Sequence, residues 1–199
     1  MLQRKYNLEL TEAGCDEAGR GSLVGPVFAA AVILPENFQA EGLNDSKKLN
    51  PKKREQLKEI IETTAICFSI ATATKEEIEK LNILNASILA MHRALDQLSV
   101  RPTIILVDGN RFKPYNQIEY ACIVKGDGTY ESIAAASILA KTYRDSFMNQ
   151  LHEEYPQYGW NHNKGYATKE HLLAIHEYGL TPYHRRTFKI SLQTRLTFK

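Results

Sequence analysis

Thr103-Ile104-Ile105-Leu106-Val107-Asp108 is the stretch of sequence that decides the fold. Its apolar residues follow one another without a polar interruption, which predicts a strand buried on both faces by covering helices. Pro102 ends the helical pattern before it, and the strand runs directly into an acid. In open sheets of this kind functional sites gather at the carboxyl ends of the strands, so Asp108 is the first candidate site residue.

The segments on either side of this strand alternate between strand and helix patterns. Further strands are expected at Glu12 to Asp16, Leu23 to Leu34, Ala65 to Ala73 and Ile118 to Val124. Helices are expected over Lys52 to Glu62, Asn85 to Leu98, Ser132 to Tyr155, and from Thr168 to near Gly179. Asn50-Pro51 is a typical helix start, and Thr74 with Glu77 matches a capping box. Because the strands do not alternate strictly with helices, the fold class expected is α/β with a mixed sheet.

The composition is that of an ordinary globular enzyme, with 199 residues of which 43% are apolar and 24% charged. The longest apolar run, Val27 to Leu34, is too short to span a membrane, and no signal segment is recognisable, so the cytoplasm is the expected location. Cys15, Cys67 and Cys122 lie far apart without a CxxC pair. They indicate reduced thiols rather than a disulfide framework or a thiolate zinc site.

The net charge of +2 means that a nucleic-acid partner would have to be met by a local basic patch. One such patch is present from Leu180 to the chain end, which contains five basic residues and no acid. They are Arg185, Arg186, Lys189, Arg195 and Lys199. Arg185 and Arg186 are candidate duplex contacts, although a solvated tail without function explains the charge equally well.

Three more acids occupy positions like that of Asp108. Asp16 and Glu17 close the first strand, and Asp127 follows the strand at Ile118 to Val124. Four carboxylates crowded at one sheet edge would repel one another unless a cation lay among them. Hard divalent cations such as magnesium or manganese prefer oxygen ligands, so Asp16, Glu17, Asp108 and Asp127 form the candidate metal site.

Each acid taken singly has a plainer interpretation. An Asp beside Gly, as at Asp108 and Asp127, is commonly a turn residue. Asp16 and Glu17 could be solvated residues of an opening hairpin. The group of four therefore carries more weight than any member.

Two other kinds of site fit the sequence less well. Gly14 and Gly19 have the spacing of a phosphate loop, but Arg20-Gly21 stands where that loop needs Lys and Ser or Thr. His171 and His176 are five positions apart, off one helix face, which argues against a zinc pair.

Six short motifs carry a resemblance to a known family. They are Asp16-Glu17-Ala18-Gly19-Arg20-Gly21, Asp45-Ser46-Lys47-Lys48-Leu49, Val107-Asp108-Gly109, Lys125-Gly126-Asp127, Ala134-Ala135-Ala136-Ser137-Ile138-Leu139-Ala140-Lys141 and Asn163-Lys164-Gly165-Tyr166. In this order and spacing, from about Gly14 to Phe188, the chain resembles bacterial ribonuclease HII. Ser22 stands where many relatives have proline, and nothing corresponds to the extra amino-terminal domain of the related ribonuclease HIII.

The resemblance implies a ribonuclease H-like fold, in which helices flank a mixed five-stranded sheet and a helical carboxyl-terminal extension follows. One domain over residues 1–199 is expected, with a catalytic core to about residue 155 and a substrate-holding region from about residue 156. The implied enzyme is an endoribonuclease that cleaves the RNA strand of RNA–DNA hybrids and cuts 5′ of ribonucleotides embedded in duplex DNA, leaving 3′-hydroxyl and 5′-phosphate ends. Asp16, Glu17, Asp108 and Asp127 would bind two divalent cations, Mn²⁺ or Mg²⁺, about 4 Å apart.

The same resemblance implies residues that contact the substrate. Gly19, Arg20 and Gly21 would form a loop whose backbone meets the ribose, and Tyr166 would stack on the sugar at the junction. Lys47 resembles a substrate-contacting lysine. A tight turn would also explain both glycines, and a tyrosine is often only packing.

Lys141 and Asp145 are four positions apart on the expected long helix. Oppositely charged residues at this spacing commonly pair on the helix surface, so both are interpreted as lying outside the site.

Two other functional classes remain open, namely another nuclease of the same fold and a non-catalytic nucleic-acid-binding module. A monomer that binds a nucleic-acid duplex and no membrane is expected. A further hypothesis is docking on a replication clamp, based on a polar residue followed by apolar ones near the chain end, namely Gln193, Leu196 and Phe198. Packing of the tail against the protein is the alternative.

Overall fold

The computed structural model describes residues 2–7, 9–44, 46 and 49–190. Their strands form one five-stranded sheet in the order β3-β2-β1-β4-β5. The bounds are β1 Glu12–Ala18, β2 Val27–Ile33, β3 Cys67–Ala73, β4 Ile104–Asp108 and β5 Glu119–Ile123. The β1–β2 and β2–β3 pairs are antiparallel, whereas β1–β4 and β4–β5 are parallel. The expected mixed five-stranded sheet is confirmed.

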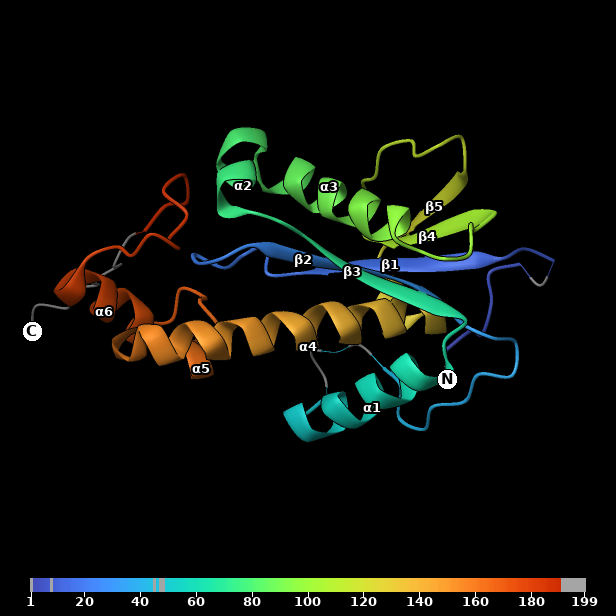
Figure 1. Ribbon diagram of the computed structural model, residues 1–199, viewed down its shortest axis with the longest axis horizontal. Coiled ribbons are helices and arrows are strands. Elements are labelled where there is room, and N and C mark those ends of the chain that lie inside the picture. Colours follow the sequence, from blue (N-terminus) through green and yellow to red (C-terminus); the bar gives the residue numbers. More distant parts are fainter. Residues whose placement is uncertain (1, 8, 45, 47–48, 191–199) are drawn as a thin grey trace, which may run out of the picture.

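Helices cover both faces of the sheet. Their bounds are α1 Pro51–Thr64, α2 Lys75–Leu81, α3 Ile83–Asp96, α4 Glu131–Glu154, α5 Trp160–Asn163 and α6 Lys169–Tyr178. Figure 1 shows α2 and α3 on one face, α1 and α4 on the other, and α6 at the end of α4. This two-sided cover explains why β4 is an unbroken apolar run. Among the described residues, no helix combines the length and the apolarity needed to cross a membrane.

Side-chain caps fix where several helices begin. The Asn50 side chain accepts a hydrogen bond from the Lys53 N–H (2.8 Å) at the start of α1. Thr74 and Glu77 form the expected capping box, which begins the short helix α2. Asn82, with a φ of 67°, then separates α2 from α3.

The second strand is shorter than expected, because it begins at Val27 and not at Leu23. The Leu23 N–H donates to the Gly165 carbonyl (2.8 Å), and Val24 forms an isolated bridge with His184. Residues 23–26 therefore connect the sheet to the carboxyl-terminal part of the chain. This long-range pairing leaves no periodic signal in the local sequence.

Small residues let α4 lie close to the sheet. A Cβ added at Gly14 in β1 would lie 2.1 Å from the carbonyl carbon of Ser132 in α4. Ala134, Ala135 and Ala136 follow on the same helix and are fully buried. The helix is thereby held against the strand that carries the first two candidate acids.

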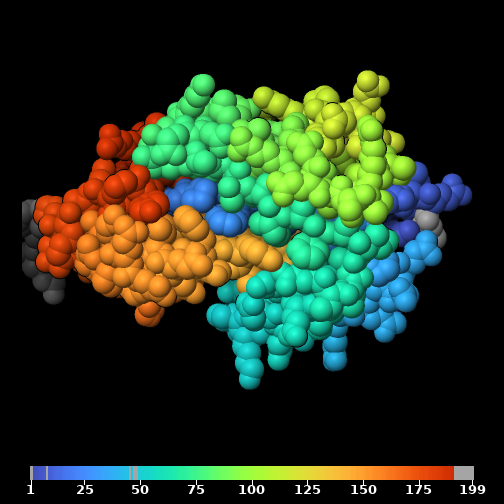
Figure 2. All heavy atoms as spheres, viewed as in Figure 1, coloured from blue at the N-terminus to red at the C-terminus, as the bar shows by residue number. Residues whose placement is uncertain are grey.

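A buried cluster of aromatic and histidine side chains holds the carboxyl-terminal part together. Figure 2 shows this segment (red) packed against the end of α4 (orange). His171 Nε2 accepts from Trp160 Nε1 (3.0 Å) and His171 Nδ1 bonds to the Tyr166 carbonyl (2.9 Å), so the proton of His171 is on Nδ1. The Thr181 N–H donates to His184 Nδ1 (2.9 Å), which leaves His184 Nε2 as the donor to His171 (3.3 Å). The network fixes the backbone at Tyr166.

Candidate active site

The candidate acids approach one another at the carboxyl ends of β1 and β4. Asp16 and Asp108 each lie one step beyond a paired position of these parallel strands. The Gly126 N–H donates to Asp108 Oδ1 (2.7 Å), which brings the turn that carries Asp127 to the end of β4. The register therefore gathers three chain segments at one edge of the sheet, as the sequence predicts.

Asp16 is buried in β1, at 4% exposed. Burial raises the pKa of Asp16 well above its usual range, and the charges of Glu17 and Asp108 raise it further. Hydrogen bonds from the Ser137 side chain and from the Glu17 N–H (2.7 Å) act in the opposite direction and lower that pKa. Three carboxylates thus interact electrostatically at this edge.

A cleft of 690 Å³, here called the acid cleft, opens beside these carboxylates. It brings Glu17 and Asp108 together with the predicted ribose-contacting residues. Its lining consists of Glu17, Ala18, Gly19, Arg20, Gly21, Ser46, Arg54, Asp108, Ser137, Lys141 and Tyr166. Two of these residues are bonded to each other, since Arg20 Nη1 donates to Glu17 Oε1 (3.0 Å). Residues that are far apart in the sequence therefore share one cavity.

Asp127 is buried, in a one-turn 3₁₀ helix at Gly126–Gly128, and does not line the acid cleft. Within the described part of the chain, no three or more Asp, Glu, His or Cys side chains are already arranged to hold a metal ion. Repulsion between carboxylates favours such a separation until a cation binds. The all-oxygen donor set fits a hard divalent cation such as Mg²⁺ or Mn²⁺.

Gly19 and Gly21 shape the loop between β1 and residues 23–26. Gly19 has a φ of 97°, and a Cβ added there would lie 2.1 Å from Nε of Arg144. A Cβ at Gly21 would lie 3.8 Å from Cε1 of Tyr166. The loop therefore passes closely over one buried side chain and faces the predicted sugar-stacking ring.

Arg144 is a buried residue that none of the sequence motifs assigned to the site. Its guanidinium donates from Nη2 to the Lys164 carbonyl (2.9 Å) and lies 5.4 Å from the centre of the Tyr166 ring. Its helical spacing does indicate burial, because Arg144 lies four positions from both Ala140 and Met148 on the buried stripe of α4. Arg144 thus packs against both the Gly19–Gly21 loop and the Tyr166 ring from the protein interior.

Arg185 corrects an expectation, because it is fully buried rather than part of an exposed basic tail. Its Nε donates to the Gly25 carbonyl (2.8 Å) and its Nη1 to the Arg20 carbonyl (3.0 Å). Burial, and then the charge of Arg144, lower the pKa of Arg185 to about 9. The side chain stabilises the loop from inside and is not placed to meet a duplex, whereas Arg186 is exposed.

Lys141 and Asp145 also differ from expectation, because they are not a surface pair. Lys141 Nζ donates to Asp145 Oδ1 (2.6 Å), and the two side chains are only 18% and 14% exposed. Arg54 Nη2 lies 3.6 Å from the other carboxylate oxygen of Asp145. Helix spacing predicts the pair itself but not the third partner from α1, nor the position of Lys141 at the acid cleft.

Lys47, the predicted substrate-contacting lysine, lies outside the described residues. Its neighbour Ser46 lines the acid cleft and shares a hydrogen bond with Ser137 (2.9 Å between the two hydroxyl oxygens). Arg54 Nη1 donates to the Ser46 carbonyl (3.0 Å). Ser46 is therefore held at the cleft by both its side chain and its carbonyl.

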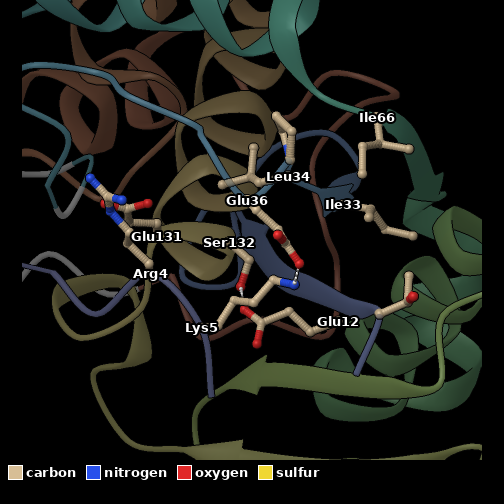
Figure 3. A pocket seen from close by; sticks show the side chains of 11 residues that line it. Arg4, Lys5, Glu12, Ile33, Leu34, Glu36, Ile66, Glu131 and Ser132 are labelled. Carbon is tan, nitrogen blue, oxygen red and sulfur yellow. Dashed lines mark hydrogen bonds and ion pairs between the residues drawn. The ribbon is translucent and has the colours of Figure 1, made fainter. Parts of the chain in front are cut away.

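A smaller pocket of 170 Å³ lies at the other end of β1 (Figure 3). Three of its charged groups already have partners. Lys5 Nζ lies 3.3 Å from Glu36 Oε1, and Glu12 accepts from the Ser132 hydroxyl (2.7 Å). The acid cleft, and not this pocket, is the candidate active site.

Comparisons with known proteins agree on one family. The sequence pattern of the family described as ribonuclease HII matches residues 13–195. Ribonuclease HII of Phocaeicola vulgatus is 60% identical over 190 residues, which cover 96% of this chain and 94% of that protein. Among solved structures, the ribonuclease H2 of Pyrococcus horikoshii superposes with a TM-score of 0.75 at 27% identity, covering 90% of this chain and 94% of that one. The PCNA:RNase HII complex of Archaeoglobus fulgidus gives 0.74 at 25% identity, covering 95% and 100%.

Proposed function

Because the chain belongs to the ribonuclease HII family and is a metal-dependent ribonuclease H type 2 endoribonuclease, we propose that the acid cleft is where it cuts its substrate. The proposed substrates are the RNA strand of RNA–DNA hybrids and ribonucleotides embedded in duplex DNA, cut on their 5′ side. One observation carries the proposal: Glu17 and Asp108 line the same cavity as the Gly19–Gly21 loop and Tyr166. The products would carry 3′-hydroxyl and 5′-phosphate ends.

Asp16, Glu17, Asp108 and Asp127 are the proposed metal ligands, with Mg²⁺ or Mn²⁺ as the proposed ions. Two such ions, when bound, activate a water molecule and stabilise the leaving 3′-oxygen of a phosphodiester. Their charge would also offset the burial and the repulsion from Glu17 and Asp108 that together raise the pKa of Asp16.

Hydrogen bonds orient two of these carboxylates before any substrate arrives. Asp16 is held by the Glu17 N–H and the Ser137 side chain, and Asp108 by the Gly126 N–H. Fixed carboxylates lose little freedom when they bind a cation or position a phosphate, which favours catalysis.

The Gly19–Gly21 loop and Tyr166 are the proposed readers of ribose. Only the 2′-hydroxyl distinguishes one ribonucleotide from its DNA neighbours, and carboxylates with a metal cannot read it. A loop without Cβ atoms at Gly19 and Gly21 can present its backbone to that hydroxyl. The Tyr166 side chain, 37% exposed, is available to stack on the adjacent sugar.

The decisive experiment uses a duplex with one embedded ribonucleotide, assayed with Mn²⁺ or Mg²⁺ and again after chelation. Wild-type protein should cut 5′ of the ribonucleotide only with metal present, and Asp108→Asn should abolish cleavage while the protein folds and still binds the duplex. Near-normal turnover by that variant would remove Asp108 from the mechanism. Cleavage of all-DNA duplexes, or binding without cleavage, would favour one of the two other functional classes.

Residues from about 156 onward, with Arg186 and Lys47, are proposed to help hold the duplex, and the enzyme is proposed to act as a cytoplasmic monomer. The complex of the Archaeoglobus fulgidus RNase HII with PCNA supports a separate proposal, that Gln193, Leu196 and Phe198 dock on a replication clamp. These three lie outside the described residues. Unchanged clamp binding after deletion of Gln193 to Lys199 would remove that proposal.

A further inference from the structure

A second groove, of 590 Å³, continues from the acid cleft and shares Arg54 and Lys141 with it. Its wall on α4 includes Lys141, Asp145 and Asn149, which are spaced by four and therefore lie on one helix face. At 1.5 Å per residue this wall is about 12 Å long. Figure 2 shows α4 (orange) and α1 (cyan) as neighbouring parts of one molecular face.

Positive charge exceeds negative charge in this groove. Arg54, Lys141 and Lys164 line it, and Asp145 is shared between Lys141 (2.6 Å) and Arg54 (3.6 Å). The other acid in the lining, Glu55, lies 3.0 Å from Lys58. Asp145 is therefore left as the one carboxylate that offsets the three positive charges of the lining.

The surroundings of the lysines show the same imbalance. Burial lowers the pKa of both Lys141 and Lys164, and the charges of Arg54 and Arg144 lower it further, whereas Asp145 raises it. A partly buried groove with excess positive charge concentrates the field that attracts anions.

Uncharged polar groups complete the lining. Ser146 is exposed on α4, and Asn161 faces the groove from α5. Phosphate oxygens in nucleic acids are contacted by this combination of Lys, Arg, Ser and Asn side chains.

We propose that this groove binds a short row of phosphodiester groups of the duplex, beyond the bond that is cut. The inference rests on the proposed function, because it takes the duplex to be seated in the adjoining acid cleft. B-form DNA carries one phosphate charge per roughly 3.4 Å of axis in each strand, so a wall of about 12 Å spans more than one phosphate. Either strand can supply these groups, and the experiment distinguishes them.

The test measures binding of a duplex with one embedded ribonucleotide, in the presence of a chelator. Single phosphates on each strand are replaced in turn by neutral methylphosphonates. Wild-type affinity should fall roughly three- to tenfold at a few adjacent positions on one strand, which identifies that strand as the source. Lys164→Gln should bind the unmodified duplex weaker by a similar factor, lose sensitivity at those positions, and reduce the slope of log K against log salt by about 1.

Two further variants serve as controls. Lys80→Gln removes a lysine from α2, on the other face of the sheet, and should leave affinity and salt slope unchanged. Ser146→Asp adds a negative charge at an exposed position and should weaken binding without lowering the melting temperature, which keeps the test valid if Lys164→Gln folds poorly.

The proposal is overturned if Lys164→Gln keeps the wild-type methylphosphonate pattern, or if Ser146→Asp binds as tightly as wild type. The same measurements distinguish failure of this proposal from failure of the proposed function. If the wild-type protein cleaves at the ribonucleotide but Lys164→Gln loses sensitivity to no methylphosphonate, only the proposal for the groove is overturned. If Lys164→Gln does lose that sensitivity but the wild-type protein does not cleave at the ribonucleotide, only the proposed function is overturned.

Discussion

A methyl group added at Gly19 would meet a buried guanidinium, because its Cβ would lie 2.1 Å from Nε of Arg144. The backbone there also has a φ of 97°, which residues with a side chain rarely adopt. Gly19→Ala should therefore move the loop over the acid cleft. Since a displacement of about 1 Å can cost about 100-fold in rate, we expect a loss of that order on an embedded ribonucleotide.

Gly179→Ala is the matched control for this substitution. Gly179 also has a positive φ, 78°, but an added Cβ would have nothing within 4 Å. It should cost about 1–3 kcal/mol of stability through backbone strain and leave cleavage unchanged. Equal cleavage rates for the two variants would show that the contact with Arg144 does not position the loop.

Arg185 and Arg186 are adjacent in sequence but lie in different environments. Arg185→Ala would leave the Arg20 and Gly25 carbonyls without their buried donor, so the free energy of unfolding should fall by about 2–4 kcal/mol in urea denaturation. Arg186→Ala should leave stability unchanged and reduce the salt dependence of duplex binding. Equal stability of the two variants would contradict the structural role of Arg185.

At the scale of elements, the loop after β1 and the segment before α6 act together. The Leu23 N–H donates to the Gly165 carbonyl (2.8 Å), so the two sides of the proposed ribose site are hydrogen-bonded. Tyr166→Ala should lose much more activity on one embedded ribonucleotide than on a long RNA–DNA hybrid, where neighbouring contacts still position the phosphate.

Tyr166→Phe keeps the ring and should keep most of this selectivity, so the ratio of the two cleavage rates is the quantity to measure. If Tyr166→Ala slowed both substrates by the same factor, junction reading would have to be assigned to other residues.

Local sequence patterns predict those elements whose burial is governed by local periodicity. The apolar run that forms β4 and the capping box at Thr74 both appear as expected. The register of parallel strands then brings Asp16 and Asp108 together, which the positions of the acids at strand ends predict.

Other features depend on contacts between segments that are distant in sequence. Residues 23–26 resemble a strand but bond to the carboxyl-terminal part. Arg185 is buried because two carbonyls more than 150 positions away accept its hydrogen bonds. Charge alone predicts an exposed residue there, since buried arginine is rare without such partners.

At the scale of the whole molecule, the pair formed by His171 in α6 and His184 makes stability depend on pH. Burial, and then the charge of His171, lower the pKa of His184 to about 4. In the unfolded chain His184 has its usual pKa of about 6.5. Its contribution to stability is therefore complete above about pH 6.5 and is lost as the pH falls toward 4.

Urea denaturation at pH 7 and pH 5 should show a loss of the order of 1–2 kcal/mol from this residue. The raised pKa of Asp16 acts in the opposite direction, so the difference between wild type and His184→Gln isolates the histidine. His176→Gln, at an exposed position, should keep the wild-type pH dependence. Identical pH dependence in wild type and His184→Gln would contradict the prediction.

The close contact between Gly14 and Ser132 fixes α4 against the sheet, and α4 continues unbroken to Glu154. Ser137 on this helix bonds to Asp16, and Asn149 lies at the proposed phosphate groove twelve positions later. At 1.5 Å per residue the two are about 18 Å apart along a rigid rod. The helix would then fix the distance between the bond that is cut and the phosphates bound in the groove. No hinge would lie between the two sites, because both are carried by one continuous element.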